Sequence, residues 1–371
     1  MKIGIFPVMA GRRGGGPETY EHNLVQSMSS YAPENNYHVF CLSEAAAQSF
    51  PETGDNVHYE ILKPGWRTVS MALSLPLAVK RSQPDIFHST FTPPPFSPGR
   101  NVFTMHDTSM FEHPEFYPTL IRLRLNRLIK SGLRKSKMII CISEHCRQTV
   151  QDYFGIPDER LAVAYHGIDP RITRVDEEQA RKVVVEHYGL DAPYMLYVGK
   201  FEKRKNVFRI LRAYREFIDQ NGRDVKLVMV GKRDWNAEAF DALVAELDLG
   251  DHVIQPGYVD SAHLPALYSA AEVFLFASLW EGFGLPVLES MACGTPVITS
   301  NGSSLAEVAG DAALLVDPYD VSDIAAAMNR LHNDNELKQQ FVQKGFDRTG
   351  HFSLEQCAAK TLEAYQRALE A

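Results

Sequence analysis

The 371-residue sequence lacks several features that define whole classes of protein. It has no run of 18 apolar residues, so no transmembrane helix is expected. Its opening, MKIGIFPVMAGRRGGG, has only a short apolar run and no small-residue cleavage site, so a signal peptide is not expected either. The net charge of −8 argues against nucleic acid as the main partner. These absences predict a cytoplasmic protein with no nucleic-acid partner.

Cysteine is scarce and scattered. The five cysteines are odd in number, and none has the Cys or His spacing of a zinc site. We therefore expect reduced thiols in the core and no metal site.

Length and composition indicate two domains. The chain is too long to fold around one hydrophobic core of ordinary size. Its content of 45% apolar and 23% charged residues is typical of a globular protein. Charge is unevenly spread: residues through Val175 hold 19 Lys+Arg against 16 Asp+Glu, and the remainder holds 19 against 30. The more basic first half is where an anionic acceptor or a membrane surface would be met.

Short apolar runs alternate with helical patterns along both halves. The expected strands are Met1–Val8, Tyr37–Leu42, Val57–Leu62, Ile86–Ser89, Val102–His106, Met138–Ile142, Leu161–Asp169, Tyr194–Gly199, Val225–Gly231, Val253–Pro256, Val273–Ala277 and Val297–Thr299. This alternation predicts an α/β protein with doubly wound parallel sheets. We place the interdomain linker near Pro170–Val175, before an acidic, helix-prone stretch.

One stretch, Ser278–Gly294 (SLWEGFGLPVLESMACG), carries the strongest site signal. Gly282 and Gly284 allow close approach of the main chain to a ligand, and Pro286 suits a first helical turn. A helix start favours phosphate. Phosphate would repel the carboxylates of Glu281 and Glu289, which flank this loop. We therefore expect these carboxylates to accept hydrogen bonds from hydroxyl groups on the parts of the ligand that are attached to the phosphate. The stretch therefore predicts a nucleotide-sugar site.

A cationic loop follows the strand that ends at Gly199. Its sequence, Lys200–Asn206 (KFEKRKN), places four cations in six residues at a strand's carboxyl end, which suits phosphate oxygens. A solvated basic loop is the alternative. Near the start of the chain, the glycine-rich run Gly11–Gly16 opens a strand–loop–helix unit, although it is not a G-x-G-x-x-G motif.

Glu281-x7-Glu289 with GFGLP inside resembles the signature of retaining glycosyltransferases of the GT-B fold, in the large family called GT4. The resemblance implies two Rossmann-like domains facing a cleft. The first, 1–172, would bind the acceptor and be joined by the final helix at 353–371. The second, 173–352, would bind the donor.

The resemblance also implies roles for individual residues. Lys205 would neutralise the leaving diphosphate, Glu281 would hold sugar hydroxyls, and His106 would contact the donor sugar. Lys200 stands where the family commonly has Arg, so its role is less defined. The residues expected to bind the nucleotide sugar are Gly15, Gly16, Gly199, Lys200, Arg204, Tyr258, Val259, Phe283, Gly284, Leu285 and Glu289. No metal and no covalent nucleophile are implied, and front-face displacement is expected.

The two glutamates do not suit a glycosidase. A retaining hydrolase needs carboxyl groups about 5–5.5 Å apart. Eight residues of helix separate Cα atoms by about 12 Å. Glu281 and Glu289 therefore fit different parts of one ligand, and by resemblance Glu289 holds the ribose.

The segments GRRGGGPETYE and MHDTSMFEHPEFY look most like those of bacterial polysaccharide mannosyltransferases. GDP-mannose is the preferred donor, and a glycan or lipid-linked glycan is the expected acceptor. The alternatives are a UDP-hexose-dependent glucosyl- or galactosyltransferase and an α-glucan synthase of the same fold. An epimerase is disfavoured by GFGLP. A non-catalytic two-lobed sugar-binding protein would normally be exported.

A basic amphipathic helix is expected over 121–137, with seven basic residues and no acids. Ile121, Leu125, Leu128 and Ile129 would share one face. Such a helix can contact an anionic membrane or can be an ordinary surface helix.

Overall fold

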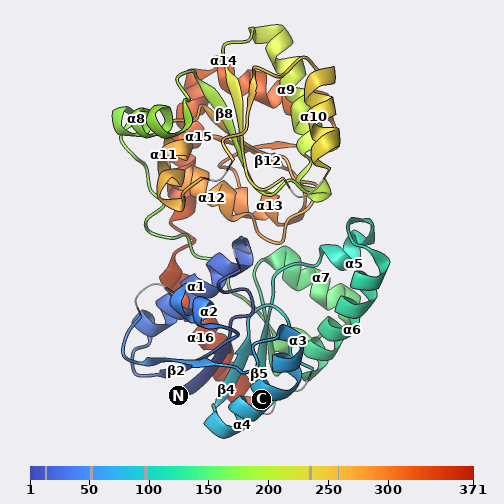
Figure 1. The fold of residues 1–371 in the computed structure, drawn as a ribbon, viewed down its shortest axis with the longest axis vertical. Helices are drawn as coiled ribbons and strands as arrows, with labels where there is room; N and C mark the ends of the chain where they lie inside the picture. The colour runs from blue at the N-terminus through green and yellow to red at the C-terminus, as the bar shows by residue number, and fades with distance from the viewer. Residues whose placement is uncertain (13–14, 51–52, 96–98, 234–235, 258) are drawn as a thin grey trace. The chain divides into compact units, whose positions relative to one another are not determined.

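The computed structural model describes residues 1–12, 15–50, 53–95, 99–233, 236–257 and 259–371 (Figure 1). The chain forms two compact units, Met1–Gly167 with Phe352–Ala371, and Ile168–His351. From the sequence, we expected the domain boundaries to follow residues 172 and 352. Gly167 packs on the first unit, because a Cβ there would meet the backbone of Leu354 at 2.6 Å. Beyond it, Val175 N donates to Ser269 Oγ at 3.0 Å, so the residues expected to form the linker pack on the second unit.

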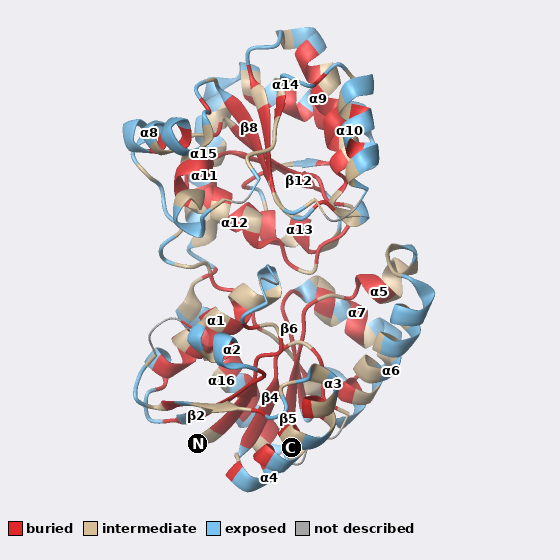
Figure 2. Ribbon diagram, viewed as in Figure 1, coloured by how far each residue is buried: buried red, intermediate tan, exposed pale blue. Residues whose placement is uncertain are grey.

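The first unit is built on a seven-stranded sheet in the order β3-β2-β1-β4-β5-β6-β7. All of its pairings are parallel. Its strands are β1 Lys2–Phe6, β2 Asn36–Cys41, β3 Val57–Ile61, β4 Ile86–Ser89, β5 Asn101–Met105, β6 Met138–Cys141 and β7 Leu161–Val163. The middle strands are buried over their whole length (Figure 2), as parallel strands covered on both faces should be.

Helices cover both faces of this sheet. Alternate side chains pack with α1 and α16 on one face and with α4, α6 and α7 on the other. The helical segments are α1 Gly16–Tyr31, α2 Glu44–Gln48, α3 Arg67–Val69, η1 Ser70–Ser74, α4 Leu75–Ser82, α5 Ser109–Glu112, η2 Pro114–Phe116, α6 Thr119–Lys135, α7 Glu144–Phe154, η3 Asp158–Arg160 and α16 Leu354–Glu370.

The last helix, α16, is held to this unit by buried polar contacts as well as by apolar packing. Tyr365 Oη lies 2.7 Å from Nδ1 of His88, whose Nε2 lies 2.7 Å from Thr104 Oγ1. Thr104 in turn contacts the hydroxyl of Tyr20 on α1 at 3.0 Å. The chain of contacts runs from α16 to α1 along one face of the sheet, through β4 and β5.

The second unit has a six-stranded parallel sheet in the order β10-β9-β8-β11-β12-β13. Its strands are β8 Tyr194–Val198, β9 Lys226–Val230, β10 Val253–Ile254, β11 Val273–Phe276, β12 Val297–Ser300 and β13 Leu314–Val316. Its helical segments are α8 Glu177–Tyr188, η4 Lys203–Lys205, α9 Val207–Asn221, α10 Ala237–Glu246, η5 Ser261–His263, α11 Leu264–Ser269, α12 Leu285–Ala292, α13 Ser303–Ala309, α14 Val321–Asn333 and α15 Asn335–Thr349. The predicted pair of doubly wound parallel sheets is confirmed.

In each sheet the strand order reverses direction at one point. These points lie between β1 and β4 and between β8 and β11. Ligands of such sheets bind beyond the carboxyl ends of the strands at this reversal. The loops after β1, β4, β8 and β11 are therefore where sites are expected.

Helix α6 departs from its predicted pattern. Leu125, Leu128 and Ile129 are partly buried, as expected, and Ile129 packs against the core. Ile121 was expected on the same face, but half of its surface is exposed. Leu120 and Leu123 are also exposed, at 82% and 51%.

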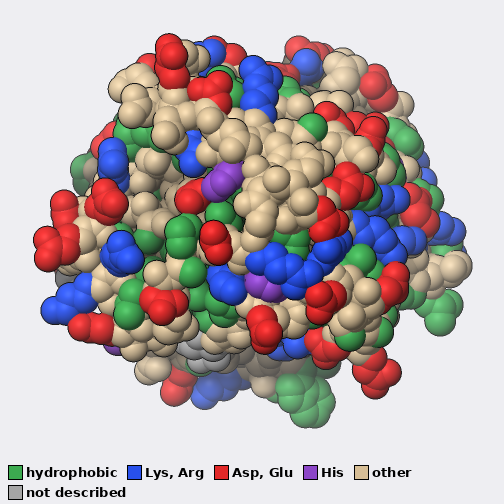
Figure 3. Space-filling view, turned by 90° about the horizontal axis from the view of Figure 1, so that it is seen from above, with side chains coloured by type: hydrophobic (Ala, Val, Ile, Leu, Met, Phe, Trp, Pro, Cys, Tyr) green, Lys and Arg blue, Asp and Glu red, His purple; other side chains and the backbone are tan. Residues whose placement is uncertain are grey.

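Other broad expectations concern cysteine, charge and membrane spans. All five cysteines are buried and unpaired, as predicted. Acidic and basic side chains are interspersed over the face seen in Figure 3. Across the ranges that the structure describes, no helix combines the length and apolarity needed to span a bilayer.

Candidate functional site

The loops that follow β8 and β11 meet through an ion pair. Lys205 ends η4 after β8, and Glu281 lies in the loop after β11. Lys205 Nζ is 2.5 Å from Glu281 Oε1, and Arg204 Nη1 is 3.0 Å from Oε2 of the same carboxylate. The backbone joins the loops as well, because Leu279 N donates to Arg204 O at 2.7 Å. The structure thus brings three predicted site residues together at the point where the sheet reverses.

This carboxylate is buried and ionised. Glu281 is only 6% exposed. Burial raises the pKa of its carboxyl group, but the charges of Lys205 and Arg204 outweigh burial and leave the pKa below its ordinary value. Burial lowers the pKa of Lys205, and the charge of Glu281 offsets part of that effect. The lysine ammonium also lies 4.8 Å above the ring of Phe276. An ammonium has three donors, so Lys205 can hold Glu281 and still donate to a ligand.

The turn between Glu281 and α12 requires glycine at one position. Gly284 has φ of +116° and immediately precedes α12. This φ favours glycine, and a Cβ at this position would also meet Leu305 Cδ2 at 2.6 Å, so a side chain would strain the backbone and displace Leu305. Phe283, Gly284 and Leu285 are buried at the start of α12, where the helix dipole is positive.

Two serines hold this turn, and neither was predicted from the sequence. Ser304 Oγ donates to the carbonyls of Glu281 and Phe283 at 2.8 and 2.9 Å. Ser303 Oγ accepts from Glu281 N at 3.3 Å. The one available signal was the pair of adjacent serines at a helix start, where hydroxyl groups often satisfy backbone groups.

Asn206 is a third missed residue. It is buried and adopts the left-handed conformation at φ of +61°. Its Nδ2 donates to Ala277 O at 2.9 Å and to Pro318 O at 2.6 Å. Asn206 therefore fixes the loop after β8 to the end of β11, next to Lys205.

Gly199 and Lys200 lie at the end of β8. Gly199 N donates to Val230 O at 2.9 Å, and a Cβ on neighbouring Gly231 would meet Gly199 O at 1.9 Å. The two strand ends are therefore packed backbone to backbone. Lys200 is exposed and forms no ion pair with any residue in the described ranges.

The remaining donor-site residues of this unit lie farther along the chain. Glu289, on α12, accepts a hydrogen bond from Tyr268 Oη at 2.9 Å. Burial raises the pKa of Glu289. Val259 is half-buried after β10, and Tyr258 lies outside the described residues. Within the described ranges, no three His, Cys, Asp or Glu side chains are placed to hold a metal ion.

The other predicted residues belong to the first unit. Gly15 has φ of +73° and precedes α1, which begins at Gly16. His106 follows β5, and its Nε2 lies 2.6 Å from Thr90 O. A carbonyl only accepts, so this nitrogen carries the proton. Burial lowers the pKa of His106 to about 4. The ring is therefore neutral at pH 7, and Nδ1 is a hydrogen-bond acceptor.

Glu21, on α1, is a fourth residue that was not predicted from the sequence. Its side chain on α1 is fully buried and accepts from Met9 N at 2.9 Å and from Thr90 Oγ1 at 2.6 Å. Burial raises its pKa to about 8. Glu21 links the loop after β1 to the segment after β4. The sequence feature that could have revealed Glu21 is a charged residue on the apolar face of a predicted helix.

Comparisons with known proteins cover both units. Residues 14–172 match the family described as Glycosyltransferase Family 4, and residues 181–348 match Glycosyl transferases group 1. O-antigen chain mannosyltransferase B of Escherichia coli is 32% identical over 267 residues, which are 72% of this chain and 70% of that protein.

Solved structures show the same fold. Sucrose-phosphate synthase of Thermosynechococcus elongatus superposes with a TM-score of 0.79 at 21% identity, over 99% of this chain and 98% of that one. HepE of Anabaena, in complex with UDP and glucose, gives a TM-score of 0.77 at 16% identity, over 98% of each chain. The two parallel-sheet units are those of the GT-B architecture. The chain belongs to the group 1 and family 4 glycosyltransferases, and it is a glycosyltransferase enzyme.

Proposed function

We propose that this enzyme is a retaining hexosyltransferase of polysaccharide synthesis that transfers mannose from GDP-mannose to a glycan or lipid-linked glycan. The named activity of the Escherichia coli relative supports the sugar and the pathway class. The observation that carries the proposal is the buried ion pair of Lys205 and Glu281, with Arg204 beside it, at the strand reversal of the second sheet.

In the proposed reaction, the bond between the anomeric carbon and the β-phosphate oxygen breaks, and its electron pair leaves with the phosphate. Lys205 and Arg204 stabilise the charge that grows there. Removal of one such preorganised donor costs about 2.7–4 kcal/mol in other enzymes. The acceptor hydroxyl forms the new bond on the same face, and its proton passes to the departing phosphate oxygen.

Glu281 has two tasks in this scheme. Its ionised carboxylate holds the Lys205 ammonium in place, and it accepts hydrogen bonds from sugar hydroxyls. The turn at Phe283, Gly284 and Leu285 presents the positive end of α12 to the diphosphate.

The remaining residues bind the rest of the donor. We assign Glu289 to the ribose hydroxyls, and Gly199 and Lys200 to the phosphate side of the nucleotide. Tyr258 and Val259 would contact the base through the main chain. In the first unit, Gly15 and Gly16 would contact the diphosphate, and Nδ1 of neutral His106 would accept from a hydroxyl of the sugar. No metal is required in this scheme.

Helix α6 favours contact with an anionic membrane. Its first turns expose Leu120, Ile121 and Leu123, and the same helix exposes Arg124 and Arg127. Exposed apolar side chains flanked by arginine suit an interfacial helix. A lipid-linked acceptor would then be met at the membrane surface.

A second donor class is kept because HepE, a structural neighbour, binds UDP and glucose. A thermal-shift panel of GDP, UDP, ADP and dTDP separates the candidates, because a ligand that binds only the folded state raises stability by RT ln(1+[L]/Kd). We expect GDP to give the largest shift, and incubation with GDP-mannose and a mannosyl acceptor to yield a longer glycan. A larger shift with UDP would move the donor to a UDP-hexose. Failure of all four nucleotides to bind would overturn the proposed function.

A further inference from the structure

Three arginines of the first unit lie on segments that follow the carboxyl ends of separate strands, and their charges are near enough to act on one another. Arg12 lies on the loop after β1, Arg67 on α3 and Arg124 on α6. In the part of the chain that the structure describes, none of the three forms an ion pair. They are distinct from the residues that hold Glu281 in the second unit.

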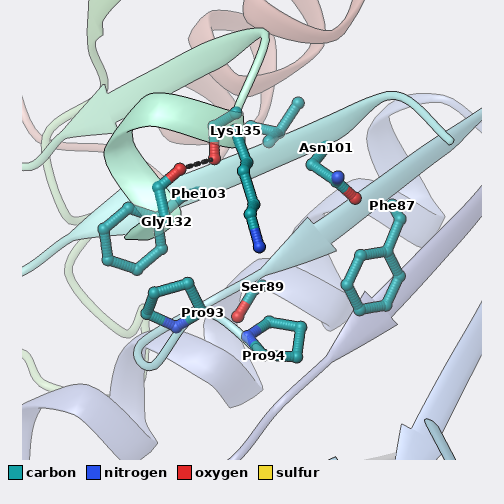
Figure 4. A pocket seen from close by; sticks show the side chains of 10 residues that line it. Phe87, Ser89, Pro93, Pro94, Asn101, Phe103, Gly132 and Lys135 are labelled. Atoms are coloured by element: carbon teal, nitrogen blue, oxygen red, sulfur yellow. Dashed lines mark hydrogen bonds between the residues drawn. The ribbon is translucent and has the colours of Figure 1, made fainter. Parts of the chain in front are cut away.

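The segment after β4 lies between the two helices. Arg67 Nη2 donates to Thr92 Oγ1 at 2.9 Å, which ties α3 to this segment. On its other side, a Cβ on Gly132 of α6 would meet Pro93 Cγ at 2.3 Å, so the helix backbone lies directly on the proline ring. Lys135 Nζ donates to Pro95 O at 2.8 Å. Figure 4 shows Pro93 and Pro94 next to Gly132 and Lys135. Thus α3 contacts this segment at Thr92, and the last turns of α6 contact its continuation at Pro93 and Pro95.

The loop that carries Arg12 is fixed to the same place. Glu21 bonds both Met9 N, three residues before Arg12, and Thr90 Oγ1, at the start of the segment after β4. The amide of Arg12 donates to Glu18 Oε1 at 3.1 Å. The backbone position of Arg12 is therefore defined, while its side chain is exposed.

The charges act on one another. Burial lowers the pKa of Arg67, and the nearby charges of Arg12 and Arg124 lower it further. Glu21 opposes this effect, but its own pKa of about 8 means that it is mostly protonated at pH 7. Three cations thus lie near one another, and within the described ranges no carboxylate forms an ion pair with any of their guanidinium groups, an arrangement that an anion would stabilise.

We propose that Arg67, with Arg12 and Arg124, binds a phosphate or diphosphate group of the acceptor. A guanidinium fork donates two parallel hydrogen bonds to such a group. This inference rests on the proposed function, which assigns the donor diphosphate to the second unit and to Gly15 and Gly16 of the first, and leaves the three arginines to the acceptor. It makes a phosphorylated acceptor a better substrate than the same glycan without phosphate.

Pyrophosphate binding to the full-length protein tests the proposal. Lys205→Met serves as the parent, so that pyrophosphate binding at the donor's phosphate site is weakened. In calorimetry, we expect Arg67→Gln to weaken pyrophosphate binding at least tenfold and Arg124→Gln to weaken it several-fold. Arg134→Gln is the matched control, because Arg134 is an exposed arginine on the same helix. Circular dichroism and melting temperature check that each variant is folded.

A second series of titrations uses farnesyl diphosphate to distinguish two sources of the phosphate group, a lipid-linked acceptor and a soluble phosphate ester. Tighter binding than pyrophosphate, lost in Arg67→Gln, would support a lipid-linked acceptor. Equal binding, lost in the same variant, would support a soluble phosphate ester. Either result upholds the site.

The proposal is overturned if Arg67→Gln binds pyrophosphate as tightly as its parent, or if Arg134→Gln loses as much affinity. Nucleotide binding by the protein with Lys205 intact is a separate readout. If no nucleotide binds, the proposed function fails, while the pyrophosphate result still decides the arginine site.

Discussion

The ammonium nitrogen of Lys205 lies 2.5 Å from a carboxylate oxygen of Glu281, although the two residues are 76 positions apart in the chain. Each residue follows a different strand at the point where the sheet reverses, so the fold itself creates the contact. Arg204 bonds the second oxygen of the same carboxylate. The cation proposed to receive the leaving diphosphate is therefore held by the acid proposed to bind the sugar.

Replacing Lys205 with Met should lower kcat by roughly 10²–10³, because one preorganised donor to the leaving phosphate is lost. Met keeps an unbranched side chain over Phe276. Steady-state transfer kinetics measure the effect. Lys203→Met is the control, since Lys203 is exposed in the same turn and should transfer sugar at nearly the rate of the wild type. Equal activity in the two variants would remove Lys205 from the reaction.

Replacing Glu281 with Ala should abolish detectable transfer while the protein remains folded. The variant loses the contact to the sugar hydroxyls and leaves Lys205 without its carboxylate partner. Transfer assays and circular dichroism are measured on the same preparation. A folded variant with turnover near that of the wild type would place Glu281 outside the site.

His106 should make stability depend on pH in the acidic range. Its folded-state pKa of about 4 lies below its ordinary value of 6.5, so above pH 6.5 it is neutral in both states and has no effect. As pH falls from 6.5 towards 4, the unfolded chain binds a proton that the folded chain does not, and stability decreases. His88, with a pKa of about 3, adds to the trend. The melting temperature of the wild type should therefore fall more between pH 7 and 4.5 than that of His106→Gln.

Exposed His58 supplies the control for that comparison. His58→Gln should keep the wild-type slope of melting temperature against pH. A His106→Gln variant with the same slope would contradict the assigned protonation state.

Removing divalent metals should leave transfer unchanged, because lysine, arginine and the start of α12 are proposed to neutralise the diphosphate. The rate is measured with and without EDTA, and then after Mg²⁺ is added back. A loss that Mg²⁺ restores would show that a metal ion performs this task.

Much of the fold followed from residue patterns. Continuous apolar runs such as Met138–Ile142 and Val273–Ala277 marked buried parallel strands, and each expected strand has a counterpart in the structure. The elements that were not named include β13 and the adjoining helices α14 and α15. Strand β13, at Leu314–Val316, is three residues long at the sheet edge, so its apolar run is too short to stand out.

The site was only partly readable. Local motifs singled out Lys205, Glu281 and the glycine turn as candidates, because each lies next to a strand end. They did not predict that Lys205 and Glu281 are paired, since that contact depends on the strand order. Ser304 and Asn206 were missed for a related reason: both act through backbone carbonyls of distant segments, which leave no trace in local sequence.

The most direct test of the central claim compares the affinities of GDP and GMP in the wild type and in Lys205→Met, measured by calorimetry. The two ligands differ by the β-phosphate alone, which Lys205 is proposed to bind. We predict that the wild type prefers GDP and that this preference is largely lost in Lys205→Met, while GMP binding is unchanged. A preference for GDP that stays the same in both proteins would contradict the account.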